Sequence, residues 1–418
     1  MEILIFFLII IVIYALFSKL LKKTTVTSPI VFTALGLFLG SETLGIIETE
    51  LDLEVFLIVS ELALVLTLFL DASRIHVRSL KEESALPLRL LAIGMPLTIF
   101  LGTFFAAAFF VEFSIWESAI IATILAPTDA GLGKKIVNSR LVPSNIRHSL
   151  NVESGLNDGL AVPLLILFIA LAEAGTAVQS PNVWVSFAVE QLGFGLLVGL
   201  FIGVIGSKLL AWSLNNDWIS DTYKRLIFPA LAVIAWVSAE AMGGSGFIAA
   251  FVGGLTMARV VKRVGGDFVR FMEAEGQLII LLVFFLFGIF TARNILDLDI
   301  AIILYAILSL TIIRMLPVFI SLLGKKLRFN SILFVGWFGP RGLASIVLGL
   351  TLLNETSSLP GLNKIALIIM ATVLMSIFAH GISSNYLTDR YSSIAAKLPE
   401  NAPENLPIKG MPTRKHHP

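Results

Sequence analysis

The decisive stretch of this chain reads Ala126-Pro127-Thr128-Asp129-Ala130-Gly131, and Glu153-Ser154-Gly155-Leu156-Asn157-Asp158 follows it. Each stretch places a carboxylate, Asp129 or Asp158, inside a segment apolar enough to span a bilayer. An aspartate at the centre of a membrane helix costs about 2.5–3.5 kcal/mol, and in transporters such a group usually marks an ion or proton pathway. Pro127 and Gly131 beside Asp129 predict an interrupted helix with free backbone carbonyls.

The composition indicates a polytopic membrane protein. Of 418 residues, 57% are hydrophobic and 14% are charged, whereas soluble domains carry about 25% charged residues. The chain has no cysteine, which excludes disulfides and thiolate metal sites. A net charge of +1 gives no indication of a nucleic-acid partner. The apolar run 3–17 lacks a basic leader and a cleavage site, so we expect a membrane helix there rather than a signal peptide.

Apolar runs separated by charged clusters predict a helical bundle with about 13 transmembrane helices. A helix needs about 20 residues to cross the hydrocarbon core. The predicted spans cover approximately 3–18, 27–44, 52–72, 87–111, 117–135, 147–172, 184–212, 222–240, 246–260, 270–291, 297–322, 331–353 and 362–386.

The basic residues predict how this bundle is oriented. With these spans, nearly all of the 30 basic residues fall in loops on one side, while Arg293 and Lys364 fall on the other. The positive-inside rule then places the N-terminus outside and the C-terminus in the cytoplasm, in the cell (inner) membrane of the producing organism. The tail 391–418 is rich in Pro, Asn and Lys, and we expect it to be disordered.

The spans divide into two halves of six around one central helix, so the halves must have opposite topology. The fifth span is interrupted at Pro127, and its counterpart in the second half carries Gly336-Trp337-Phe338-Gly339-Pro340-Arg341-Gly342. Interrupted segments at matching positions of two repeats are typical of a transporter binding site. The predicted fold class is therefore all-α, with two inverted six-helix repeats and two broken helices.

The polar residues near mid-membrane predict a site for a small hard cation. Ser154 and Asp158 are four residues apart, so they share one helix face, and Asn157 lies on the adjacent face. Carboxylate, hydroxyl and backbone carbonyl oxygens suit Na⁺, Li⁺ or H⁺. A structural role is the alternative for both aspartates, because Asp129 in particular can satisfy the backbone of the broken helix.

Other charged residues receive structural interpretations. Glu153 and Arg341 lie at comparable depth, and a buried ion pair between them would brace the two broken regions. Arg314 is expected to neutralise a buried acid or to extend toward the interface. Asp71 ends the third span, where an interfacial cap is favoured over a place at the rim of the ion pathway. We expect His380 to be a packing histidine rather than a pH sensor.

At these residues the chain resembles the monovalent cation:proton antiporter superfamily, and within it the electroneutral NhaP-type sodium/proton antiporters. The run 126–163, with Thr128-Asp129 and Asn157-Asp158, is similar to that family's signature. Phe338-Gly339-Pro340-Arg341-Gly342 resembles its second broken helix. The likeness covers 1–390 and excludes the tail.

The resemblance implies an antiporter fold of the NhaA/NapA type and a homodimer in the lipid bilayer. Within a transmembrane domain 1–390, core helices would cover about 87–172 and 297–386. Dimerisation helices would cover about 1–72 and 184–291. One departure from the family is Leu70-Asp71-Ala72, where many relatives carry Glu-Gly.

The resemblance also implies roles for individual residues. Asp158 would be the main carboxylate for Na⁺ and H⁺. Asp129, Ser154 and the Thr128 carbonyl would complete the Na⁺ site, with Asn157 holding it. Glu153 and Arg341 would form the stabilising ion pair, and Arg314 matches a further functional arginine.

The function predicted from these features is exchange of Na⁺ or Li⁺ for H⁺ by alternating access. Electrogenic relatives carry a second aspartate at the position of Asn157, so one cation per proton is expected. K⁺/H⁺ exchange remains an alternative, as do a cation channel and an organic-anion transporter. An enzyme is not expected because no nucleophile–base set appears, and no cofactor is expected beside the transported ions.

Overall fold

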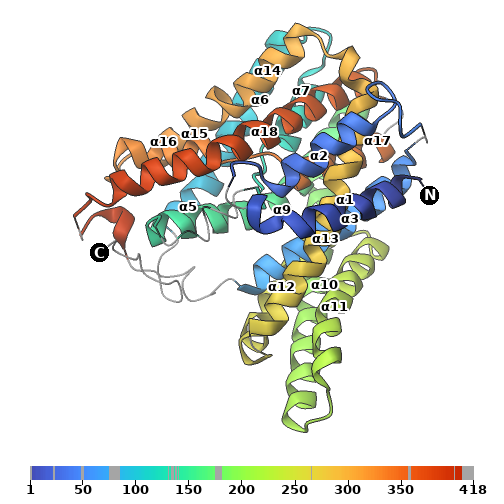
Figure 1. Ribbon diagram of the computed structural model, residues 1–418, viewed down its shortest axis with the longest axis vertical. Helices are drawn as coiled ribbons and strands as arrows, with labels where there is room; N and C mark the ends of the chain where they lie inside the picture. Colours follow the sequence, from blue (N-terminus) through green and yellow to red (C-terminus); the bar gives the residue numbers. More distant parts are fainter. Residues whose placement is uncertain are drawn as a thin grey trace. The chain divides into compact units, whose positions relative to one another are not determined.

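The computed structural model describes residues 2–21, 24–48, 51–74, 85–129, 131–132, 136, 139, 141–174, 181–264, 266–355, 359–399 and 401–406. These residues form helices and connecting turns with no β-strand among them (Figure 1). Within this part of the chain, eight helical stretches are long and apolar enough to cross a membrane, and four shorter apolar helices accompany them. The predicted all-α membrane fold is confirmed.

The first half of the chain follows the predicted spans closely. Its elements are α1 (Glu2–Leu21), α2 (Ser28–Leu39), α3 (Leu53–Arg74), a continuous run of α5 (Ala85–Arg89), the π-helix η1 (Leu90–Gly94) and α6 (Met95–Phe109), then α7 (Ile115–Ile124) and α9 (Ser144–Ala174). The short α7 is the first half of the predicted broken helix.

The second half contains the remaining spans and the second broken helix. Its elements are α10 (Pro181–Asn215), α11 (Asp221–Ala241), α12 (Gly246–Val264), α13 (Gly266–Asn294), η2 (Ile295–Asp297), α14 (Ile300–Leu310), α15 (Ile312–Leu322), α16 (Phe329–Trp337), α17 (Leu343–Glu355), α18 (Leu362–Ala395) and η3 (Pro403–Asn405). The predicted twelfth span is thus split into α16 and α17.

The chain forms two compact units. The first comprises Met1–Leu57, Glu83–Asn157 and Leu281–Pro418, and the second comprises Ile58–Glu82 and Asp158–Ile280. Both broken helices and the first half of α9 belong to the first unit. The division into core and dimerisation helices expected from the family resemblance groups the helices differently and stays a prediction.

Each unit is packed through close backbone contacts. In the first unit, a Cβ atom added to Gly36 of α2 would collide with the backbone of α13 at Phe285. In the second unit, a Cβ atom at Gly199 of α10 would lie 2.9 Å from Cα of Ala249 in α12. Glycine lets these helices approach closely without a side chain between them, as is common where membrane helices pack.

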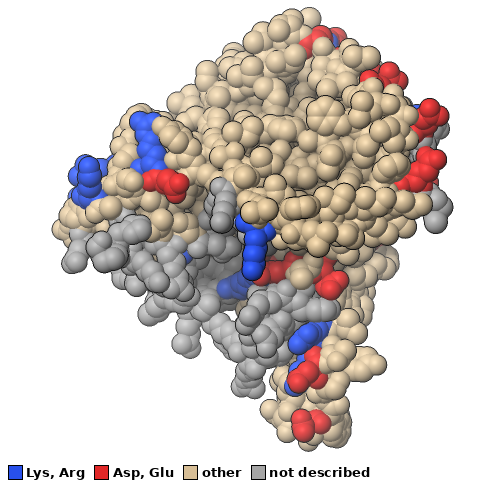
Figure 2. Space-filling view, in the orientation of Figure 1, with Lys and Arg blue, Asp and Glu red and all other residues tan. Residues whose placement is uncertain are grey.

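The surface of the first unit fits a lipid environment. Large apolar side chains such as Leu16, Phe100 and Phe104 are exposed on it. The upper part of the face in Figure 2 is largely free of Lys, Arg, Asp and Glu, and the charged groups lie toward its edges and below it. Large apolar side chains exposed on the outside of a helix bundle are what a membrane-spanning protein presents to lipid.

Glu117, in the first turn of α7, forms hydrogen bonds both with the turn before α7 and with the turn before α18. Ser114 and Glu117 form a capping box: the Ser114 N–H donates to Glu117 Oε2 at 2.8 Å, and the Glu117 N–H donates to Ser114 Oγ at 3.2 Å. The Gly361 N–H also donates to Glu117 Oε1 at 3.1 Å. One buried carboxylate therefore caps the first broken helix and holds the turn that precedes α18.

The disorder predicted for 391–418 is wrong for residues 391–399 and 401–406, while residues 407–418 lie outside the described residues. The helix α18 continues to Ala395, and Glu404 is fully buried. Glu404 Oε1 accepts hydrogen bonds from the Arg328 N–H (2.8 Å) and the Ser331 hydroxyl (2.9 Å). Asn145 Nδ2 donates to the Pro403 carbonyl at 2.8 Å. The prediction of a solvated tail rested on its polar composition. Composition does not reveal that Glu404 caps a helix far away in the sequence.

The segment 396–406 is expected to contribute measurably to stability. Glu404→Ala removes the acceptor at the N-terminus of α16, and loss of a helix cap costs about 0.5–2 kcal/mol. The unfolding temperature of the purified protein should fall. Glu404→Gln keeps a carbonyl acceptor and should lose less. Equal unfolding temperatures for Glu404→Ala and the wild type would contradict this role.

Candidate functional site

The two predicted breaks are confirmed, and they touch each other. The helix α7 ends at Ile124 before an extended segment around Pro127, and α16 ends at Trp337 before α17 begins at Leu343. The Asp129 N–H donates to the Pro340 carbonyl at 2.7 Å. Each break exposes backbone groups that lack helical partners, and this bond pairs a donor of one with an acceptor of the other.

The Asp129 side chain joins the same two breaks. Its Oδ1 accepts from the Gly131 N–H at 2.6 Å, and its Oδ2 accepts from the Leu343 N–H at 2.9 Å. Leu343 is the first residue of α17, where a negative charge is favourable. A Cβ atom at Gly342 would collide with Asp129 Oδ2, so the close approach requires glycine there. The structural role kept open for Asp129 is therefore present, and cation binding by Asp129 stays a prediction.

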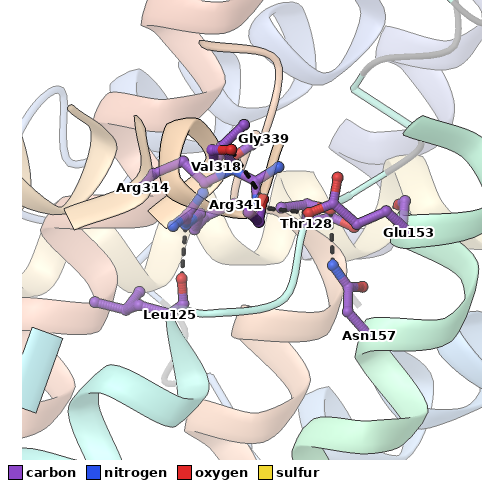
Figure 3. Close-up of polar contacts among 10 residues, drawn as sticks. Leu125, Thr128, Glu153, Asn157, Arg314, Val318, Gly339 and Arg341 are labelled. Carbon is purple, nitrogen blue, oxygen red and sulfur yellow. Dashed lines mark hydrogen bonds and ion pairs between the residues drawn. The ribbon is translucent and has the colours of Figure 1, made fainter. Parts of the chain in front are cut away.

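Residues of α9 contact the first break. The Ser154 hydroxyl donates to the Thr128 carbonyl. Asn157 Nδ2 donates to Thr128 Oγ1 at 2.8 Å (Figure 3). All three residues are buried. The structure thus brings Thr128, Ser154 and Asn157 together, while cation binding by them stays a prediction. Asp158 follows on α9, one helical turn beyond Ser154, and 9% of it is exposed.

The buried ion pair requires a correction. Glu153 pairs with Arg314, not with Arg341 as predicted: Arg314 Nη1 lies 2.6 Å from Glu153 Oε1, and 3% of each side chain is exposed. Arg341 instead donates from Nε to the Leu125 carbonyl at 2.6 Å and from Nη1 to the Gly339 carbonyl (Figure 3). The reason is that Arg341 lies inside a break, where carbonyls without helical donors compete for its guanidinium.

Three residues of α18 that were not among the predicted site residues also contact the second break. His380 Nε2 lies 2.9 Å from the Trp337 carbonyl oxygen, and the Arg341 N–H donates to Ser376 Oγ at 2.7 Å. Trp337 Nε1 donates to Ser383 Oγ at 3.0 Å. The signal was present as polar residues at i, i+4 and i+7 in an otherwise apolar helix, which places them on one face. His380 is buried and bonded, as expected for a packing histidine.

Asp71 lies in the second unit, at the end of α3. Arg74 Nη1 is 3.8 Å from Asp71 Oδ1, and Arg74 Nη2 is 2.8 Å from Glu273 Oε1. These side chains are about one quarter to one third exposed. Both roles considered for Asp71, the interfacial cap and the rim of the ion pathway, stay predictions.

The chain is similar to known cation/proton antiporters over most of its length. The family model described as "Sodium/hydrogen exchanger, transmembrane" matches residues 6–388. A K⁺/H⁺ antiporter NhaP2 of Shewanella baltica is 25% identical over 397 residues, which are 94% of this chain and 66% of the relative. A K⁺/H⁺ antiporter NhaP of Alkalimonas amylolytica is 27% identical, covering 82% of this chain and 60% of the relative. This chain therefore spans about two thirds or less of these relatives' length.

A solved structure has the same fold. The sodium proton antiporter MjNhaP1 of Methanocaldococcus jannaschii, determined at pH 8, superposes with a TM-score of 0.75 and 21% sequence identity. The match covers 95% of this chain and 99% of that one. The antiporter fold is thus shared over nearly the full length of both chains.

The corrected ion pair predicts a specific double-mutant result. Glu153→Gln or Arg314→Gln alone leaves an unpaired buried charge, which costs about 3–5 kcal/mol. The double variant Glu153→Gln with Arg314→Gln should recover much of the lost thermal stability in detergent. The double variant Glu153→Gln with Arg341→Gln should not recover the lost stability. Recovery in that variant would indicate that Arg341, and not Arg314, is the partner of Glu153.

Proposed function

Since the chain belongs to the sodium/hydrogen exchanger family, we propose that it exchanges Na⁺ or Li⁺ for H⁺ across the cell membrane, one cation per proton. The family is one of transporters, so cation/proton exchange is the class of activity to test. The ion, the stoichiometry and the residues that bind the ion are the proposal.

One observation supports a cation site more than any other. Asn157 Oδ1 is buried, and no group in the described part of the chain donates a hydrogen bond to it. An acceptor without a donor at membrane depth is unfavourable unless a cation or water binds there. Ser154 gives its only hydrogen to the Thr128 carbonyl, so the lone pairs of its Oγ remain available.

These oxygens and the Asp158 carboxylate suit a small monovalent cation. Asp158 follows Asn157 on α9, so its carboxylate comes from the same turn of helix. Hydroxyl, amide, carbonyl and carboxylate oxygens are hard ligands that Na⁺ and Li⁺ prefer. Asp129 is the remaining member of the proposed ligand set. Because an aspartate binds either a proton or a cation, the two ions compete for one site.

Competition at one site gives coupled exchange when the site faces only one side at a time. Inverted repeats with broken helices are the architecture of alternating-access transporters, in which part of the bundle moves around a mid-membrane site. In this mechanism Asp158 crosses either protonated or with a cation, and not as an empty anion. Proton movement in one direction therefore drives cation movement in the other.

The stoichiometry rests on Asn157. Its amide nitrogen donates to Thr128 Oγ1, a bond that an ionised aspartate cannot make. Asn157 therefore holds the first break without adding a titratable charge. With Asp158 as the one carboxylate that exchanges ions, one cation replaces one proton and no net charge moves.

K⁺/H⁺ exchange is the second candidate, and the Shewanella and Alkalimonas relatives, named as K⁺/H⁺ antiporters, favour it. The ligand types alone do not set the size of the ion. An organic-anion transporter is less well supported, because Arg314 is paired with Glu153 and Arg341 bonds backbone carbonyls. A cation channel is less well supported, because inverted repeats with broken helices are typical of alternating access. A homodimer with the N-terminus outside and the C-terminus in the cytoplasm remains part of the proposal.

An ion-jump assay tests the exchange. Proteoliposomes with an imposed pH gradient receive Na⁺, Li⁺ or K⁺, with and without a voltage clamp set by valinomycin and K⁺. Collapse of the gradient on Na⁺ addition, unchanged by the clamp, is the expected result. Asp158→Asn should abolish it, because an amide cannot exchange a proton. A response to K⁺ alone would keep the mechanism and change the substrate, and no response to any cation would refute the proposal.

Asn157→Asp tests the stoichiometry separately. The added carboxylate is expected to make transport sensitive to membrane voltage and to weaken the hold on Thr128. Gradient collapse in the variant should then depend on the clamp, while collapse in the wild type should not. Voltage dependence in the wild type itself would refute one-for-one exchange.

A further inference from the structure

At the second break, one hydrogen bond of a regular α-helix is missing and side chains take its place. In an uninterrupted α-helix each N–H donates to the carbonyl four residues earlier, so the Arg341 N–H would donate to the Trp337 carbonyl. Here the Arg341 N–H donates to Ser376 Oγ at 2.7 Å. Ser376 Oγ lies 3.1 Å from His380 Nδ1, and His380 Nε2 lies 2.9 Å from the Trp337 carbonyl oxygen. Two side chains of α18 are thus inserted between the donor and the acceptor of the missing bond.

A neutral imidazole with its hydrogen on Nε2 completes the connection from the Arg341 N–H to the Trp337 carbonyl. Ser376 Oγ accepts from Arg341 and donates its hydrogen to Nδ1, while the N–H of Nε2 donates to Trp337. His380 Nδ1 also lies 3.0 Å from the Ser376 carbonyl oxygen. A hydrogen on Nδ1 would therefore bond that carbonyl, but it would place the Nε2 lone pair against the carbonyl oxygen of Trp337. That oxygen also accepts from the Gly339 N–H at 2.8 Å, and a carbonyl has lone pairs for both.

The site is closed to competing water. Ser376 and Arg341 have no exposed surface and His380 is 2% exposed. Trp337 is held a second time, because its indole N–H donates to Ser383 on the same face of α18. Buried hydrogen-bond chains of this kind fix geometry strongly, because each unsatisfied member would be costly.

The opened backbone is what presents the second break to Asp129. Pro340 has no N–H, and its carbonyl accepts from the Asp129 N–H, while the Leu343 N–H donates to Asp129 Oδ2. Closing the helix at Arg341 would draw the Trp337–Leu343 backbone into a regular turn. Both groups would then leave their positions at Asp129.

We propose that Ser376 and His380 are positioning residues, which hold the second broken helix open by relaying the hydrogen bond between Arg341 N–H and the Trp337 carbonyl. The hydrogen-bond relay itself needs no assumption about transport. If the relay positions the second break at Asp129, its loss should also weaken cation binding. The effect on ion affinity rests on the function proposed above.

The chain offers a matched control for this relay. Ser384 lies on α18, is 1% exposed, and its Oγ has no hydrogen-bond partner among the described residues. Ser376→Ala and Ser384→Ala therefore remove the same hydroxyl from the same helix at similar burial. His380→Phe is the second test variant, because it keeps a ring and removes both nitrogens.

Hydrogen–deuterium exchange of the peptide spanning 337–344 measures the relay directly. Ser376→Ala and His380→Phe should accelerate exchange at the Arg341 amide by about three- to tenfold, the effect of losing one hydrogen bond. Ser384→Ala should leave that exchange at the wild-type rate. In the ion-jump assay, the two relay variants should raise the apparent KM for the cation by a similar factor with a smaller change in maximal rate.

The outcomes separate this inference from the proposed function. Equal exchange rates in the wild type, His380→Phe and whichever serine variants fold would overturn the relay. Accelerated exchange beside an unchanged KM would keep the relay and overturn its effect on cation affinity. If the wild type transports no cation, the proposed function fails, and the exchange comparison alone decides the relay.

Discussion

A backbone group that loses its helical hydrogen bond inside a bilayer has no water to replace that bond. The structure is organised around this constraint at its two breaks. Asp129 bonds the second break through its own N–H and its carboxylate, and Arg341 donates to carbonyls at both breaks. Asp129, which is a proposed cation ligand, is thus also a group that stabilises the broken helices. Its bonds to the backbone limit how it can bind an ion.

The buried charged and polar groups of the first unit differ in how completely their hydrogen-bonding atoms are paired. The carboxylate of Glu153 has its arginine, and Arg341 is bonded to backbone oxygens. Asn157 uses its nitrogen to hold Thr128 and leaves its oxygen without a donor in the described residues. Among the described residues, Arg314 Nε and Nη2 and Arg341 Nη2 also lack a hydrogen-bond partner. A positive ligand is therefore favoured by the acceptor of Asn157 and the nearby carboxylate of Asp158, and not by an excess of acceptors over the whole site.

The sequence was sufficient for the parts of the fold that depend on local chemistry. Pro127 and Pro340 interrupt apolar segments, so the residue order alone locates both breaks. The choice between Arg314 and Arg341 as the partner of Glu153 could not be made, because both lie at similar depth and only the three-dimensional course of the breaks separates them. The relay through Ser376 and His380 was missed for the same reason: its spacing is visible in α18, but its partner is another helix.

The segment that carries Glu404 has a consequence for how the chain is assembled. It bonds the beginning of α9 through Asn145 and the beginning of α16 through Arg328 and Ser331. Synthesis proceeds from the N-terminus, so α9 enters the membrane long before the residues that fasten it exist. Until residue 406 has left the ribosome, the starts of these two helices lack their last shared connection. The first unit therefore completes its packing only after translation of α18, and a ribosome stalled before that point would leave an inserted but unfastened bundle exposed to membrane quality control.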